Sequence, residues 1–265
     1  MKRIVIFIVS YLFLCSEMIN AQIIDTVTIC NGDSVLLFSN WESQTGNYSN
    51  GLDITTLTKC DIKQKKPSLH QHPKPPGQRI AVAKDIAFGF SYPHQLKSWH
   101  TAGATISFFS PLADEEVPED TDFIFLPGGY PELHAKKIAT AYRFKSSIHK
   151  HSERNTKIYG ECGGYMVLGE SIIDEYGTGH EMLGLLRLVT SFEKRKLHLG
   201  YRELTSLITP LNGHFRGHEF HYATTIVAEG KPLFSAKDAD GIELPAMGLS
   251  HKKTFGSFAH IISEI

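Results

Sequence analysis

The sequence lacks several features that would assign it directly to a class of protein. Its 27 Lys and Arg residues nearly balance 28 Asp and Glu residues, so the net charge is -1 and no basic excess indicates a nucleic-acid partner. Hydrophobic residues make up 42% and charged residues 21%, which excludes a chain that is disordered throughout. No internal repeat is visible. With 265 residues, these absences leave one domain with an appendage, or two small domains.

Long apolar runs are also lacking. The segment Ile4 to Cys15 is almost wholly apolar, but it is too short for a comfortable membrane span. The basic residues Lys2 and Arg3 precede it, and Ala21 offers a small residue near a plausible cleavage point. This pattern predicts a signal peptide over residues 1–21 and therefore export.

Cysteine is scarce, with four residues in the whole chain. Cys30 and Cys60 flank a polar segment, and they could pair if that segment is exported or remain as two thiols. Residues 22–60 are rich in Thr, Ser, Asn and Gly and predict short strands, as at residues 25–29 and 34–38. A proline-rich stretch then indicates a linker. We therefore predict a β-rich segment and linker over residues 22–76, and a separate domain over 77–265.

The second region alternates short apolar strands with helical patterns, which is typical of an α/β fold with a parallel, doubly wound sheet. The predicted strands are 80–83, 105–109, 123–126, 158–159, 201–207, 218–227 and 255–262, and the predicted helices are 94–102, 131–151 and 163–170.

Cys162 follows a predicted strand directly and precedes Gly163, Gly164 and a predicted helix. A nucleophile on a sharp strand-to-helix turn needs small neighbours, and the N-terminus of the helix favours a thiolate. A buried cysteine that only packs as a small apolar residue is an equal alternative at this level.

Paired glycines also follow the apolar strand 123–126, at Gly128 and Gly129. They allow backbone N–H groups to approach a ligand closely, and acyl chemistry needs such donors for the oxygen that gains charge. An ordinary strand-to-helix turn would explain the same pair.

Several motifs together resemble one family, the glutamine amidotransferase domain of cobyrinic acid and hydrogenobyrinic acid a,c-diamide synthases. The resemblance covers residues 78–262, and its specificity comes from the order of the motifs rather than from any single one. The motifs are Ile80–Asp85, Phe108–Asp114, Leu126–His134, Glu161–Gly164 and Arg216–Tyr222.

The resemblance implies a class I glutamine amidotransferase fold and a set of roles. Cys162 would attack the side-chain amide of glutamine, and His260, in the string Gly256 to His260, would be its base. Backbone N–H groups of Gly129 and Gly163 would form the oxyanion hole. The carboxylate often found two residues after the histidine is absent, because Ile262 stands there. Glu264 is a poor substitute, and Glu219 is a candidate for orienting a histidine.

The motif Arg216–Tyr222 alternates with period two, so Glu219 and His221 share one face of a strand. They could bind a metal, hold substrate carboxylates or pair with each other. No further ligand set stands at suitable spacing, so we expect no metal. With Arg216 and Tyr130 they remain substrate-binding or structural candidates.

The resemblance further implies glutamine and a corrin, cobyrinic or hydrogenobyrinic acid, as substrates, and an ATP-binding half that activates the corrin carboxylates. The sequence has no Gly-Lys-Ser/Thr phosphate loop, because its only Gly-Lys pair, Gly230 and Lys231, precedes Pro232. We therefore expect no cofactor in this chain, with ATP and Mg²⁺ belonging to a separate synthetase subunit. The chain alone is not expected to make the diamide.

The sequence supports two conflicting predictions of where the protein is located. The family belongs in the cytoplasm, whereas the signal-like N-terminus indicates export. A fused reading frame or a non-catalytic module of the cell envelope is therefore the alternative function, and a cysteine hydrolase acting on another amide is a weaker one.

Overall fold

A computed structural model describes residues 35–37, 40–42, 46–48, 52–54 and 73–265. The contacts divide the chain into two units, Met1–Leu69 and His70–Ile265. In the first unit, two antiparallel pairs are described: β1 (Val35–Leu37) with β2 (Asn40–Glu42), and β3 (Gly46–Tyr48) with β4 (Leu52–Ile54).

The predicted strand 34–38 overlaps β1. The predicted strand 25–29, the predicted signal peptide, Cys30 and Cys60 lie outside the described residues. In the described part of the chain, no helix is both long enough and apolar enough to cross a membrane.

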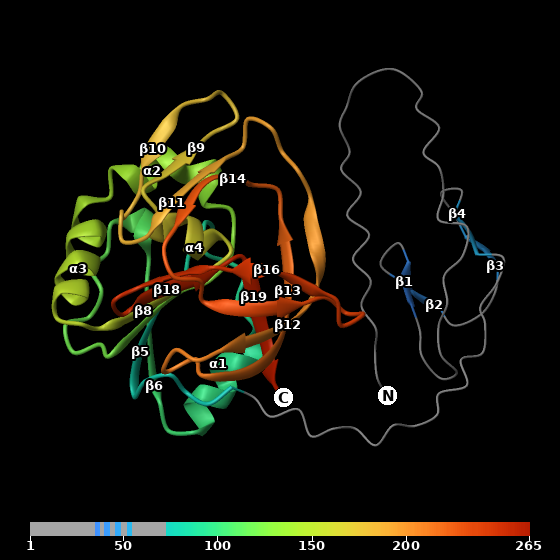
Figure 1. Cartoon of the computed structure of the whole chain (residues 1–265), viewed down its shortest axis with the longest axis horizontal. Coiled ribbons are helices and arrows are strands. Elements are labelled where there is room, and N and C mark those ends of the chain that lie inside the picture. The colour runs from blue at the N-terminus through green and yellow to red at the C-terminus, as the bar shows by residue number, and fades with distance from the viewer. Residues whose placement is uncertain (1–34, 38–39, 43–45, 49–51, 55–72) are drawn as a thin grey trace. The chain divides into compact units, whose positions relative to one another are not determined.

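A six-stranded sheet forms the centre of the second unit (Figure 1). Its order is β17-β18-β8-β7-β5-β6, and all neighbours are parallel except the edge strand β17. All four residues of β7 are buried, as expected for a parallel strand that is covered on both faces. The strands are β5 (Arg79–Ala83), β6 (Thr105–Phe109), β7 (Phe123–Leu126), β8 (Lys157–Glu161), β17 (Leu249–His251) and β18 (Thr254–Ser257).

Helices cover one face of this sheet: α2 (Ala135–Ala139), α3 (Tyr142–Glu153) and α4 (Gly163–Leu168). Ile124 and Ile158 of the sheet share a buried cluster with Phe144 of α3 and Val167 of α4. The predicted α/β class, with a parallel sheet covered on both sides, is confirmed.

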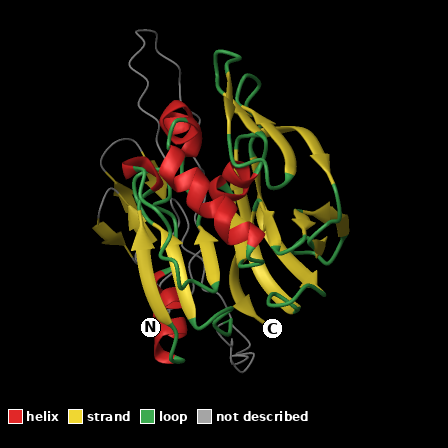
Figure 2. Ribbon diagram, turned by 90° about the vertical axis from the view of Figure 1, so that its left-hand side faces the viewer, coloured by secondary structure: helices red, strands yellow, loops and turns green. Residues whose placement is uncertain are grey.

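The opposite face of the sheet packs against α1 (Pro93–Thr101) and a second, antiparallel sheet of order β16-β15-β12-β13-β19. Val82 and Phe125 of the central sheet share a second cluster with Trp99 of α1, Leu204 of β12 and Phe215 of β13. The central sheet therefore has helices on both faces, and α1 shares its face with the second sheet (Figure 2). The strands of the second sheet are β12 (His198–Ser206), β13 (Gly213–His221), β15 (Phe234–Lys237), β16 (Glu243–Met247) and β19 (Ala259–Glu264).

A third sheet has the order β10-β9-β11-β14. Its strands are β9 (Ser171–Ile173), β10 (Gly179–Glu181), β11 (Arg187–Ser191) and β14 (Thr224–Glu229). The strands between residues 171 and 191 were not predicted from the sequence, whereas β14 overlaps the predicted strand 218–227. Two short 3₁₀ helices, η1 (Pro111–Ala113) and η2 (Pro131–His134), complete the described elements.

The single helix predicted over residues 131–151 is wrong, because η2, α2 and α3 divide that segment. The hydroxyl of Thr140 donates to the carbonyl oxygens of Lys136 and Lys137 at 3.2 and 3.1 Å, which competes with continuation of the helix. The carboxylate of Asp114 then accepts from the backbone N–H of Phe144 at 2.9 Å, in the first turn of α3.

Two predicted strands are each split between sheets. The segment 218–227 leaves the second sheet after His221 and enters the third sheet at Thr224. The segment 255–262 leaves the central sheet after Ser257 and enters the second sheet at Ala259. The hydroxyl of Ser257 accepts from the backbone N–H of Ala259 at 3.1 Å and so stabilises the local bend.

Two prolines of the predicted linker pack on the second unit. Pro73 and Pro76 are buried, and the indole N–H of Trp99 donates to the carbonyl oxygen of Pro73 at 3.1 Å. The backbone from residue 73 onward is thus part of this unit.

Candidate active site

Cys162 lies on the sharp turn between β8 and α4. Its backbone has φ 48° and ψ -105°, a conformation that non-glycine residues adopt rarely and that is retained where the surrounding structure enforces it. A side chain at Gly164 would collide with the carbonyl of Leu126, and one at Gly160 would collide with Gly164. The Gly-x-Cys-Gly-Gly sequence is therefore required by the close packing of α4 against the sheet.

The register of the strands brings His260 to Cys162. β18 runs parallel to β8 with Ser257 opposite Glu161, and the backbone N–H of Cys162 donates to the carbonyl of Ser257 at 2.8 Å. The change of sheet at residue 258 then places His260 beside the turn. A Cβ atom at Gly128 would lie 3.2 Å from Nε2 of His260 and 3.5 Å from Cβ of Cys162, so both side chains pack against that glycine.

Glu161 is a buried carboxylate that the sequence reasoning missed. Its side chain is only 2% exposed, and its Oε2 lies 3.5 Å from Nδ1 of His260. Its Oε1 accepts from the backbone N–H of Ile261 at 3.0 Å and from the hydroxyl of Tyr159 at 3.1 Å. At 3.5 Å the contact with His260 is one of charge rather than a formed hydrogen bond, and Nδ1 has no hydrogen-bond partner.

The carboxylate opposite His260 is therefore Glu161 and not Glu219, the candidate that the sequence suggested. One signal in the sequence was available: an acid that ends an otherwise buried strand next to Cys162 must find a buried partner.

His260 is nearly fully buried between two rings. His218 stacks on it with centroids 4.8 Å apart, and Phe90 meets it edge-on, also at 4.8 Å. Burial alone would lower the pKa of His260, but its interactions with Cys162 and Glu161 raise that pKa to about 9. Burial and the neighbouring His260 lower the pKa of His218 to about 4, so His218 is neutral at pH 7.

The sulfur of Cys162 faces the imidazole of His260 and a backbone carbonyl. Its Sγ lies 3.7 Å from the carbonyl oxygen of Phe220, to which the thiol donates. The imidazole of His260 interacts with the same sulfur. The thiol proton thus has a backbone acceptor, and the neighbouring imidazole is a second group that could take it.

Gly129 and Gly163 lie against each other beside the sulfur. A Cβ atom at Gly163 would be 3.1 Å from the backbone nitrogen of Gly129, and Gly129 itself has φ 153°, which favours glycine. Within residues 73–265, neither backbone N–H donates to another group. Two adjacent, unused N–H groups are the donors that an oxyanion requires.

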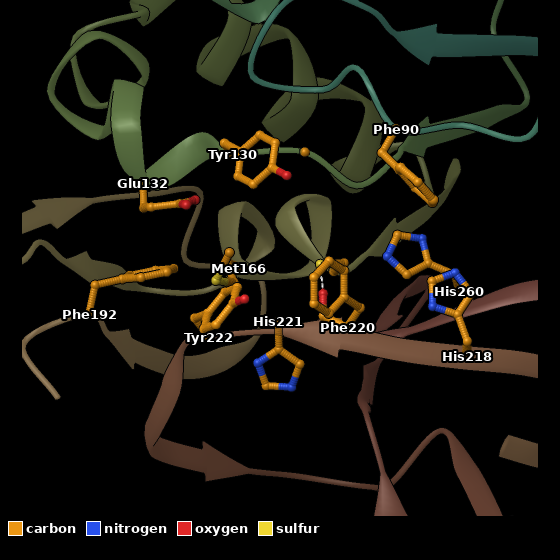
Figure 3. A pocket seen from close by; sticks show the side chains of 12 residues that line it. Phe90, Tyr130, Glu132, Met166, Phe192, His218, Phe220, His221, Tyr222 and His260 are labelled. Carbon is orange, nitrogen blue, oxygen red and sulfur yellow. Dashed lines mark hydrogen bonds between the residues drawn. The ribbon is translucent and has the colours of Figure 1, made fainter. Parts of the chain in front are cut away.

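Gly129, Cys162 and His260 line one pocket, which holds about 570 Å³ of space when the open solvent at its mouth is included. Figure 3 shows its labelled side chains, with His260, His218 and Phe90 on one side of the view and Glu132 and Phe192 on the other. Tyr130, one of the predicted candidates, lines the pocket and is 58% exposed.

The predicted pair Glu219 and His221 forms a second cluster, in which both carboxylate oxygens are hydrogen-bonded while Nδ1 of His221 has no partner. Nε2 of His221 lies 2.9 Å from Oε1 of Glu219, and Arg202 donates to Oε2 at 2.8 and 3.1 Å. Burial alone would raise the pKa of Glu219, but hydrogen bonds from His221 and Arg202 hold that pKa below its usual value. His221 reaches the pocket, whereas Arg216, the remaining candidate, is exposed and does not line it.

The same cluster has the donor types of a metal site. The ligand atoms of His198, Glu219 and His221 all lie within 4.8 Å of one another. Arg202 already neutralises Glu219, however, and a cation bound there would face that guanidinium. The arrangement therefore favours an ion-paired structural cluster.

Comparisons with known proteins add a further finding. Residues 79–264 match the family model described as the CobB/CobQ-like glutamine amidotransferase domain. The hydrogenobyrinate a,c-diamide synthase of Rhizobium meliloti (strain 1021) is 51% identical over 192 residues, which is 71% of this chain and 44% of that protein. The enzyme of the same name from Rhodobacter capsulatus is 48% identical over 194 residues, with the same shares. The chain thus spans less than half the length of these relatives.

Among solved structures, that of PurLQS from Thermotoga maritima aligns with a TM-score of 0.44 and 19% identity, and the alignment covers 69% of this chain and 86% of that one. The resemblance that the motifs suggested is confirmed by the family model and the curated relatives.

Proposed function

The chain belongs to the CobB/CobQ-like glutamine amidotransferase domain family, and we propose that its Cys162 pocket releases ammonia from glutamine. One observation supports this most strongly. The thiol stands on a positive-φ turn, and it packs against the same glycine as an imidazole whose pKa is raised to about 9. Because the family and the motifs agree, the amidotransferase is favoured over a non-catalytic envelope module.

The proposed reaction begins when the sulfur of Cys162 attacks the side-chain amide carbon of glutamine, with its proton held by His260. The N–H groups of Gly129 and Gly163 stabilise the oxyanion of the tetrahedral intermediate. His260 gives its proton to the departing nitrogen, which leaves as ammonia and yields a glutamyl thioester.

Water then completes the cycle. His260 takes a proton from the attacking water, the carbon–sulfur bond of the thioester breaks, and His260 returns the proton to the sulfur, so that glutamate leaves and the thiol is restored. Throughout these steps Glu161 is a positioning residue, because its negative charge favours the protonated imidazole and its bond to the Ile261 N–H holds the start of β19 in place.

We further propose that the ammonia serves a larger reaction, the amidation of corrin carboxylates, because the relatives are named as hydrogenobyrinate a,c-diamide synthases. The corrin, hydrogenobyrinic or cobyrinic acid, and a separate ATP-binding synthetase half that uses ATP and Mg²⁺ belong to this proposal. A cytoplasmic location, with glutamine and ATP at hand, would suit it better than export.

The test measures ammonia release from glutamine by the full chain, alone and with a separately supplied synthetase half of a curated relative. We expect Cys162-dependent release, abolished in Cys162→Ser while the melting temperature is maintained. If release persists in Cys162→Ser, or is absent both alone and with the partner, the proposed function is wrong.

A further inference from the structure

Glu132 is a carboxylate without a role in the reaction described above. It follows Pro131 in η2 and lines the same pocket as Cys162, where it is the only carboxylate among the described lining residues. Its Oε2 is buried and has no hydrogen-bond partner. A buried carboxylate oxygen left unpartnered is costly, which calls for a functional or structural reason.

The surrounding protein compensates this group only in part. Burial raises the pKa of Glu132 to about 7, although its own backbone N–H and the charge of Arg195 act in the opposite direction. Arg195 is itself held by Glu175, with the guanidinium nitrogen 2.8 Å from the carboxylate oxygen. The pocket therefore carries a carboxylate oxygen that has no hydrogen-bond partner in the described part of the chain.

The surroundings of Glu132 indicate what such a partner would be. Figure 3 shows its carboxylate directed into the space near Tyr130, Met166 and Phe192, on the side of the view away from His260. A ligand there would place aliphatic carbon against Met166 and Phe192 and a cationic group against Glu132. An α-amino acid amide has this form, because three aliphatic carbons separate the amide carbon of glutamine from its ammonium nitrogen.

We propose that Glu132 binds the α-ammonium group of glutamine, so that the pocket selects an α-amino acid amide over other primary amides. This inference rests on the proposed function, since it assigns one end of the same substrate. Glu132 contributes to binding and specificity, and the bond-breaking steps remain with Cys162 and His260.

The test compares glutamine with glutaramate, which has the same amide and carboxylate but no ammonium group. Ligand binding is measured by calorimetric titration into Cys162→Ser, with and without Glu132→Gln, so that no turnover is needed. Ammonia release is measured in parallel on the otherwise unchanged chain. We expect Glu132→Gln to weaken glutamine binding about 100-fold and to leave glutaramate binding nearly unchanged, because a buried charge partner is lost.

Two controls separate the role of Glu132 from general damage to the fold. Glu243→Gln changes an exposed acid on β16 that does not line the pocket, and it should leave the preference for glutamine intact. The rate of Cys162 alkylation by iodoacetamide, a small amide without an ammonium group, should be the same in Glu132→Gln as in the parent chain.

The outcomes are distinguishable. If glutamine releases ammonia but Glu132→Gln weakens glutamine and glutaramate equally, or neither, the assignment of Glu132 is overturned and the proposed function stands. If glutamine binds as proposed but Cys162 releases no ammonia from it in any form of the protein, the hydrolytic function fails while the ammonium site is retained. If glutamine does not bind the parent Cys162→Ser chain, both fail.

Discussion

Two glutamate–histidine pairs lie near the same pocket and differ in how the glutamate meets its histidine. Glu219 and His221 form a 2.9 Å contact, and Arg202 occupies the other carboxylate oxygen at 2.8 Å. Glu161 and His260 are more buried but stand 3.5 Å apart, with the thiol of Cys162 beside the ring. Nδ1 has no hydrogen-bond partner in either histidine, so the pairs differ at the carboxylate and in the neighbouring thiol.

We infer that this difference separates a structural pair from a reactive one. A histidine whose carboxylate is hydrogen-bonded to it and also paired with a guanidinium is held rigidly and gains little from a change of protonation. A histidine 3.5 Å from its carboxylate and next to a thiol can accept or release a proton as a reaction proceeds. The residue types are the same in both pairs, so the bonding of the carboxylate and the neighbouring thiol are what differ.

The two histidines offer the largest test of this contrast. We expect His260→Asn to lower kcat for ammonia release by about 10²- to 10⁴-fold, because the general acid and base is removed. The matched variant His221→Asn should cause a far smaller loss of kcat and should lower stability instead. Steady-state kinetics and thermal melting of both variants check this. If both variants lost kcat equally, the two histidines would not differ in their contribution to catalysis, and our interpretation of the two pairs would be wrong.

The two glutamates provide the next test. Glu161→Gln removes the charge that favours the protonated form of His260. Because the two groups are 3.5 Å apart, we expect kcat to fall by roughly 10²-fold, less than the loss of about 10⁴-fold for an acid hydrogen-bonded to a catalytic histidine. The pKa that governs the alkaline limb of the pH profile, assigned to His260 at about 9, should move downward. A purely structural role would lower activity without shifting the pH profile.

Glu219→Gln should show the opposite behaviour. It leaves Arg202, whose side chain is 13% exposed, without its charged partner, so we expect a loss of about 2 kcal/mol in the free energy of unfolding. The kcat and its pH profile should be retained. Denaturant titration measures the first and kinetics the second, and a pH shift like that of Glu161→Gln would contradict the assignment.

Stability should also depend on pH through His260. Its pKa in the folded state, about 9, exceeds the ordinary value of 6.5, so the charged imidazole stabilises the fold below pH 6.5 and this contribution is lost as pH rises through 9. We expect about 1–3 kcal/mol to be lost over that interval in the parent chain. Denaturant titrations at pH 6.5 and 9.5 should show a smaller loss in His260→Asn.

We expect the smallest effect on stability from Glu132, which is an acid whereas His260 is a base. Its pKa in the folded state, about 7, exceeds the ordinary value of 4.5, so the fold favours the neutral acid and loses stability as pH rises from 4.5 through 7. We expect Glu132→Gln to be more stable than the parent by about 1 kcal/mol above pH 7, measured by thermal melting. If the melting temperatures of Glu132→Gln and the parent chain differed by the same amount at pH 5 and at pH 8, this prediction would be wrong.

Much of the central sheet could be predicted from the sequence. Runs such as 80–83 and 123–126 are wholly apolar and match β5 and β7, because a parallel strand covered on both faces needs little polar surface. The sharp turn at Cys162 could be predicted from the neighbouring glycines, because a crowded turn needs residues without side chains and these stand close by in the sequence.

The partners of the buried acids could not be predicted in this way. Glu161 meets His260 only because β8 and β18 align in parallel and the chain changes sheet at residue 258, and both facts depend on pairing between segments far apart in the sequence. The period-two pattern correctly predicted that Glu219 and His221 share one face of a strand. It could not predict that Arg202, on the neighbouring strand β12, donates to the second oxygen of that carboxylate.

The most direct test of the central claim is to treat the full chain with a diazoketone analogue of glutamine and to identify the modified residue by peptide mass spectrometry. We expect a single adduct on Cys162 that excess glutamine prevents and that forms more slowly in His260→Asn than in His221→Asn. An unmodified Cys162, or an adduct whose rate is indifferent to glutamine and to His260, would contradict it.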